Sequence, residues 1–163
     1  MKVKVLTGLG LILVLLLLRL VLSAFGPAPS DVDQIQALIE EARIGAESGE
    51  PNRITDSIAE NAVVQGMTRR ELVRLMRTSL RQAENIRVTL SRPSVRVEGE
   101  KATAQIDKAS VSYTWNGMDT SFGLAGLTLH LERQKVRKWL VFTENRWQIV
   151  RATASGAPTI GGF

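Results

Sequence analysis

The chain has 163 residues and no cysteine, which excludes a disulfide framework and a thiolate metal site. Its 21 basic residues exceed its 16 acidic residues, but three of the basic ones, Lys2, Lys4 and Arg19, precede the first acid, Asp31. Residues 31–163 therefore carry 18 basic against 16 acidic residues, a balance that gives no support to nucleic-acid binding.

The most informative segment is the apolar run from Val5 to Leu22, which follows Lys2 and Lys4. A helix of this length, at ~1.5 Å per residue, just crosses a hydrocarbon core of roughly 30 Å. The basic residues before the run predict that the N-terminus stays in the cytoplasm and that the remainder is exported. We therefore expect a bacterial single-pass membrane protein, anchored in the bilayer through residues 5–22. A cleaved signal peptide, which would release a secreted protein, is the alternative.

The composition divides the chain into four parts. Residues 1–24 form the expected anchor or signal peptide, and residues 25–30 contain two prolines and a glycine, which predict a short linker. Residues 31–154 are long enough for one domain with a single core. Residues 155–163 are small and glycine-rich, and we predict that they form a flexible tail.

The first part of the domain is predicted to be helical. Apolar residues at helical spacing indicate an amphipathic helix over residues 31–48. A shorter helix that carries Ile54 and Ile58 is expected next, followed by a brief strand at residues 62–65.

A third helix is predicted to begin at Thr68, whose side chain can cap it while Glu71 reaches back in a capping box. Its apolar residues share one side. Four arginines on the opposite side fall within about 60° of one another. This arginine face consists of Arg70, Arg74, Arg77 and Arg81. We interpret the arginine face as a surface for anionic lipid or for an acidic protein partner, with a merely solvated helix face as the alternative.

From Ile86 onward the apolar residues recur at every second position, which predicts strands. These positions switch between even and odd numbers near Pro93, Asp107 and Gly126. An apolar face stays on one side of a sheet through such a switch only if an extra residue is inserted. We therefore predict three β-bulges that curve the sheet strongly, with a hairpin turn at Asn116-Gly117.

This order of elements predicts an α+β fold. A cone-shaped, strongly curved antiparallel sheet of four to six strands should pack on about three N-terminal helices, preceded by one transmembrane or signal helix. Over residues 31–154 the element order, the GMTRRELVRLM segment that opens the third helix and the bulged strands ending in RWQIV resemble the SnoaL-like, nuclear-transport-factor-2-like superfamily. The resemblance implies a cone which, in the ketosteroid isomerases, polyketide cyclases and dehydratases of the superfamily, holds Asp, Tyr or His over a small apolar substrate.

The chain departs from those enzymes at the positions of their reagents. The resemblance places the isomerase base on the first short strand, where this chain has Ala-Val-Val-Gln at residues 62–65, and a donor tyrosine on the first helix, which here has none. Dehydratase-like sites use paired histidines, whereas His130 is the one histidine of the chain. We therefore expect no catalytic set, no metal site and no cofactor. The expected function is a non-catalytic binding or assembly module of the cell envelope.

Three residues remain as candidates for catalysis: Asp107, Tyr113 and His130. Asp107 lies at a predicted bulge, where side chains are re-aimed, whereas His130 lies between two leucines and is expected to point outward. Tyr113 and Trp115 continue the apolar parity of their strand, so they would line the mouth of the cone as core residues or as ligand contacts. The alternative function is therefore an enzyme or carrier of the SnoaL and ketosteroid-isomerase type, with the cone as an apolar pocket.

Self-association is the remaining expectation about partners. The resemblance implies homodimers that form through the open face of the sheet, and the small polar residues Ser110, Ser112 and Thr114 would suit such a contact. Nucleic acid is not expected as a partner, because the domain is exported and the arginine face contains no aromatic residue for base stacking.

Overall fold

The computed structural model of the protein describes residues 29–137, 143–155 and 159–162. The predicted anchor, residues 5–22, lies outside these ranges, as does most of the predicted linker. Residues 31–163 form one compact unit. Within the described ranges, no helix has the length and apolar character needed to cross a membrane.

Three helices are described: α2 (Asp31–Glu47), α3 (Pro51–Thr55) and α4 (Arg69–Gln82). The predictions for the first and third helices are confirmed. The second helix is shorter than predicted, because Ser57 turns the chain into the sheet and accepts a hydrogen bond from the backbone N–H of Ile149 at 2.8 Å. Ile58 therefore begins a strand, and its assignment to the second helix is wrong.

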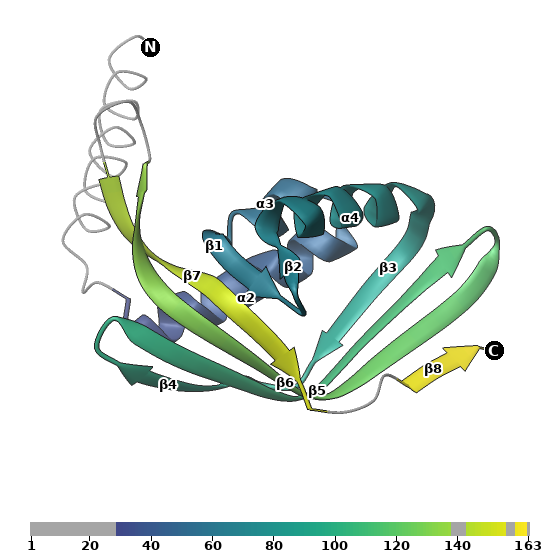
Figure 1. The fold of residues 1–163 in the computed structure, drawn as a ribbon. Coiled ribbons are helices and arrows are strands. Elements are labelled where there is room, and N and C mark those ends of the chain that lie inside the picture. The colour runs from purple at the N-terminus through teal and green to yellow at the C-terminus, as the bar shows by residue number, and fades with distance from the viewer. Residues whose placement is uncertain (1–28, 138–142, 156–158, 163) are drawn as a thin grey trace, which may run out of the picture. The chain divides into compact units, whose positions relative to one another are not determined.

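The eight strands form one sheet with the order β2-β1-β7-β6-β5-β3, in which β4 also pairs with β5 and β8 with β6 (Figure 1). Their bounds are β1 (Ile58–Val64), β2 (Met67–Thr68), β3 (Ala83–Leu90), β4 (Ser94–Glu98), β5 (Lys101–Trp115), β6 (Met118–Arg137), β7 (Thr143–Ala154) and β8 (Thr159–Gly162).

This sheet differs from the predicted one in three respects. It has eight strands, where four to six were expected. It is not wholly antiparallel, because β1 runs parallel to β7. The expected flexible tail contains β8, which pairs with residues 120–123 of β6.

The apolar residues of β5 change parity at the predicted position. The buried residues are even-numbered up to Ile106, Asp107 and Lys108 are both exposed, and half-buried apolar residues then take odd numbers from Ala109 onward. The apolar face therefore stays on one side of the sheet through the bend, as predicted.

The pairing at this bend differs from an ordinary bulge. The register of β5 with β6 is constant along the whole of β5 and skips only the pair of Asp107 and Gly126. Both strands take their extra residue at the same level, so the two insertions cancel. Gly126 has a φ of +71°, which a glycine adopts without strain.

Near Pro93, which separates β3 from β4, the pairing register with β5 is likewise unchanged. The prediction of bulges that shift strand pairing at these three places is wrong. Register shifts occur instead between Ile58 and Val63, between Glu84 and Arg87, and between His130 and Leu131.

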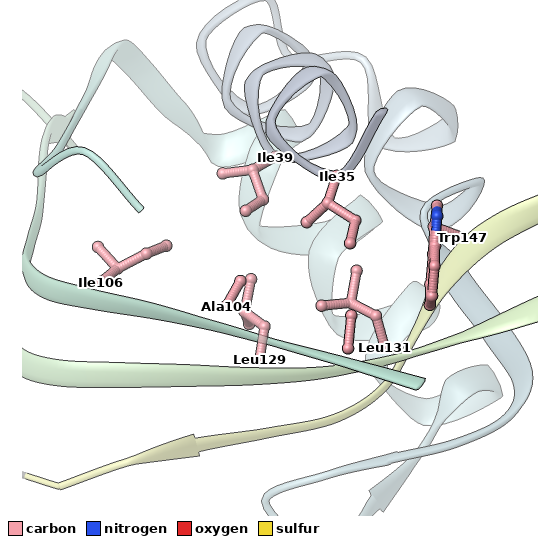
Figure 2. Packing of buried hydrophobic residues seen from close by; sticks show 8 residues of the cluster. Ile35, Ile39, Ala104, Ile106, Leu129, Leu131 and Trp147 are labelled. Atoms are coloured by element: carbon pink, nitrogen blue, oxygen red, sulfur yellow. The ribbon is translucent and has the colours of Figure 1, made fainter. Parts of the chain in front are cut away.

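The main core lies between α2 and the middle of the sheet. Figure 2 shows Ile35 and Ile39 of α2 pointing toward the side chains of β5 and β6, with Trp147 of β7 beside them. Ile35, Ile106 and Leu131 are at most 1% exposed, and burying each contributes ~1.5–3 kcal/mol. The other buried members of this cluster are Ala102, Ala104 and Leu129. A smaller second cluster, Ile58, Ala59 and Ala62, lies on β1.

The first residue of α2 is tied to the sheet by a polar cluster of Asp31, Arg133 and Trp147. The indole Nε1 of Trp147 donates to Oδ1 of Asp31 at 3.2 Å, and Nη2 of Arg133 donates to the same oxygen. The guanidinium of Arg133 lies 5.0 Å from the centre of the Trp147 ring, within cation–π distance. The domain therefore begins at a fixed point on β6 and β7.

The last residue of α2, Glu47, is tied to β3. Its carboxylate accepts the backbone N–H of Val88 at 2.8 Å and is paired with Arg43 at 2.6 Å. These contacts lower the pKa of Glu47 from its ordinary value of 4.5, chiefly through the Val88 hydrogen bond, although burial acts in the opposite direction.

We expect the stability of residues 31–163 to fall on acidification. Because the pKa of Glu47 is lower in the folded chain, its contribution is present above about pH 4.5 and is lost as the pH falls through the folded pKa. The pKa values of Glu40 and Glu71 are lowered as well, by hydrogen bonds to Arg43 and to the backbone of Thr68. Thermal melts between pH 7 and pH 3 should show a smaller acid loss in Glu47→Gln than in the native chain.

The control for this prediction is Glu84→Gln. Glu84 is exposed, and within the described residues its side chain makes no hydrogen bond or ion pair. This variant should melt like the native chain at every pH. An identical pH dependence for Glu47→Gln and the native chain would show that the prediction is wrong.

Candidate functional site

The arginine face lies on α4, a helix whose first turn has the predicted geometry. Thr68 caps the helix and accepts the backbone N–H of Glu71, while the Glu71 carboxylate accepts the backbone N–H of Thr68 at 2.8 Å. This capping box fixes where the helix begins and therefore which residues share each side. The arginine face is exposed along its whole length, at Arg70, Arg74, Arg77 and Arg81.

The four arginines differ from Arg69, on the same helix, in their partners. Within the described residues, none of the four forms an ion pair with a carboxylate, and Arg81 donates its Nε to the backbone oxygen of Arg77 at 3.2 Å. By contrast, Arg69 at the start of the same helix pairs with Glu60 at 2.8 Å and donates to the backbone oxygen of Ile58. The arginine face is therefore a cluster of positive charge that the described part of the chain does not neutralise.

The apolar side of α4 is only partly covered. Leu72 and Met76 pack against the small cluster on β1, whereas Leu75 is 50% exposed. No residue of the helix is fully buried. The helix therefore rests on the domain and presents both cationic and apolar groups at its surface.

Arg133 of β6 is a further basic residue, but it does not add a free positive charge to the surface. Arg133 is occupied by Asp31 and Trp147, so it belongs to the polar cluster at the start of α2. Lys135 is exposed, while the side chains of Arg137 and Lys138 lie outside the described part of the structure.

The three catalytic candidates are not brought together. Asp107 is exposed, and His130 lies opposite Thr103 on the outward face of the sheet, between two core leucines. Tyr113 lies six positions beyond Asp107 along β5, which at ~3.3 Å per residue separates them by about 20 Å. His130 is farther still from Tyr113, so the three residues do not form one site. No group of three His, Asp or Glu side chains within the described residues could hold a metal ion.

Tyr113 and Trp115 form an aromatic pair near the end of β5. Their ring centres are 6.4 Å apart and the rings are inclined by 74°, an edge-to-face arrangement. Both are half-buried and belong to neither core cluster. They could therefore contact an apolar ligand, as the sequence suggests, or a covering segment.

The sequence does not predict two polar cavities of the structure, although Tyr113, a predicted ligand contact, lines the second of them. One, of about 560 Å³, lies where β6 and β7 face the α3–β1 turn, and is lined by Asp56, Glu60, Arg69, Gln134, Lys135, Val136, Glu144, Arg146 and Gln148. The other, of about 320 Å³, contains Asn85, whose side chain donates to Thr114, which in turn donates to Asp119 at 2.7 Å. Their linings come from segments far apart in the sequence, so no local pattern indicates them.

The fold is similar to that of several solved proteins. A proposed aromatic ring hydroxylase from Novosphingobium aromaticivorans matches with a TM-score of 0.65 and 15% identity, over 84% of this chain and 96% of its own. A proposed scytalone dehydratase from the same species matches with a TM-score of 0.64 and 8% identity, over 80% and 85%. A nuclear-transport-factor-2-like protein from Salmonella enterica matches with a TM-score of 0.60 and 13% identity, over 77% and 89%.

These similarities establish the architecture. The domain has the nuclear-transport-factor-2-like fold. At identities of 15% or less the match extends to the fold alone, although two of the similar proteins are described as proposed enzymes. The sequence matches no protein-family model and no curated protein.

Proposed function

We propose that the chain is a non-catalytic binding or assembly module of the bacterial cell envelope, held outside the cytoplasm by residues 5–22. The observation that carries the non-catalytic part of the proposal is the aliphatic packing in segments where the resemblance places the reagents of the enzymes. Ala62 on β1, in the segment where the resemblance places an isomerase base, is 2% exposed, and Ile35 on the first helix is fully buried. Aliphatic side chains at these positions can neither abstract a proton nor donate one to an oxyanion.

The location outside the cytoplasm is supported by the sequence. The uncharged stretch between Lys4 and Arg19 is too long and too apolar for a surface segment, and basic residues precede it. The domain begins at Asp31, only a few residues after the run ends. A module held this closely would act on components of the membrane surface or on proteins anchored beside it.

The proposal is tested by fractionating cells that produce the full chain. We expect the protein in the membrane fraction, resistant to carbonate extraction, with residues 1–24 still present in its intact mass. As a control, Leu13→Arg together with Leu16→Arg should release the chain from the membrane, because two charges at the centre of the run each cost ~2.5–3.5 kcal/mol to insert. A soluble mature chain that begins near residue 25 would instead identify a cleaved signal and a secreted protein.

The second candidate function is an enzyme or carrier for a small apolar molecule. It is favoured by the Tyr113–Trp115 pair, which lies outside both core clusters, and by the two similar proteins described as proposed enzymes. This function would be supported if an apolar fluorescent probe bound the native chain and if Trp115→Ala abolished the binding. Equal probe binding by the native chain and this variant would contradict it.

A further inference from the structure

We propose that the arginine face of α4 binds the anionic lipid headgroups of the bilayer that holds the chain. This inference rests on the proposed function, because it requires a domain tethered to a membrane. It adds a partner of defined chemistry and a surface that orients the domain.

The charge of α4 supports an external anion. Its single acidic residue is Glu71, whose carboxylate is held at the N-terminus by Thr68. Its first arginine, Arg69, is used within the domain by Glu60. The four positive charges of the arginine face therefore remain, all exposed and without an ion pair in the described residues.

A lipid surface fits α4 better than an acidic protein does. The helix combines a row of arginines with an apolar side that the domain covers only in part. Leu75, on that apolar side, is half-exposed. Cationic and apolar groups on one surface helix are typical of helices that lie at the boundary of headgroups and acyl chains. A protein partner would need matching carboxylates at fixed positions, whereas a fluid anionic bilayer needs only charge and proximity.

The tether supplies that proximity. Residues 25–30 can span at most about 20 Å when fully extended. A domain held at this distance meets the surface at a high effective concentration, so weak contacts suffice for docking. Each arginine near an anionic surface should favour docking about fivefold.

The test uses the full chain inserted in lipid nanodiscs. Because the chain contains no cysteine, it can be labelled at one introduced site. Thr78 is exposed on α4, so Thr78→Cys carries the fluorophore. The discs contain phosphatidylcholine alone or with phosphatidylglycerol, together with a headgroup-attached quencher. We expect stronger quenching in the anionic discs, which high salt should remove because the interaction is electrostatic.

Three variants define the surface. Arg74→Glu with Arg77→Glu should weaken the docking equilibrium about 25-fold or more, at about fivefold for each charge lost. The same residues changed to lysine should still dock, since a point charge is enough. The matched control reverses two exposed arginines outside α4, Arg92→Glu between β3 and β4 with Arg151→Glu on β7, and should quench like the native chain. Thermal melts establish that each variant is folded.

The outcomes separate this inference from the proposed function. Insertion into both kinds of disc, followed by equal quenching in neutral and anionic lipid, would overturn the docking inference alone. Quenching that persists after the α4 reversal, or is lost equally in the control, would also overturn it. A chain that fails to insert into either disc would remove the tether and overturn both.

Discussion

Trp147→Ala is expected to lower the free energy of unfolding of the domain by ~3–5 kcal/mol, the usual cost of truncating a buried tryptophan. Trp147 is 3% exposed in the main core and also donates its indole N–H to Asp31. Its loss would leave a cavity beside Leu131 and remove the ring that Arg133 covers. Urea denaturation of the 29–163 fragment, followed by circular dichroism, measures the change directly.

Trp147→Phe separates packing from hydrogen bonding in this prediction. Phenylalanine fills much of the same volume but has no donor for Asp31, so we expect a loss of about 1–3 kcal/mol. Asp31→Asn keeps an acceptor for the indole and should cost less than Asp31→Ala. A Trp147→Ala variant as stable as the native chain would mean that the start of α2 is not held against β7 in this way.

Leu131→Ala is expected to destabilise the domain by ~2–5 kcal/mol, depending on how far the cavity collapses. Leu131 is 1% exposed and lies among Ile35, Ala102 and Trp147 in the core between α2 and the sheet. The matched control is Leu75→Ala, the same change at a 50% exposed position on α4, which should stay within about 1 kcal/mol of the native chain.

The comparison of these two variants also bears on the role of α4. If Leu75→Ala were as damaging as Leu131→Ala, the helix would be part of the core and its surface would not be available for docking. If Leu131→Ala were harmless, the cone would not be filled by aliphatic packing, and the basis for a non-catalytic module would be removed.

Much of the fold could be predicted because its signals are local. The capping box of Thr68 and Glu71 fixes the start of α4, and the two-residue turn at Asn116 and Gly117 joins β5 to β6 as expected. The parity change near Asp107 correctly indicates a bend that keeps the apolar side chains on one face. Each of these features depends on residues only a few positions apart.

The features that were missed depend on contacts between distant segments. The parallel pairing of β1 with β7 joins residues about ninety positions apart, and no pattern within β1 specifies its neighbour. The parity change predicts bulges that the pairing does not contain, because one strand alone cannot show that its neighbour carries a matching insertion. The tail is predicted to be flexible because a strand of four residues, two of them glycines, gives little signal of its own before it pairs with β6.

In the candidate site too, the features set by local sequence could be predicted, and those set by contacts between distant segments could not. The arginine face follows from helical periodicity alone, so the sequence indicated all four residues. The role of Arg133 did not follow, because its partners Asp31 and Trp147 are 102 and 14 positions away along the chain. Both polar cavities were missed for the same reason.

The most direct test of the account is the side of the membrane on which the domain lies. Thr78→Cys provides the only thiol of the chain, and a membrane-impermeant maleimide reports whether it is accessible in spheroplasts, where only the cytoplasmic membrane remains. We expect equal labelling before and after lysis if α4 lies outside the cytoplasm, as proposed. Labelling that occurs only after lysis would place the domain inside the cell and contradict the account.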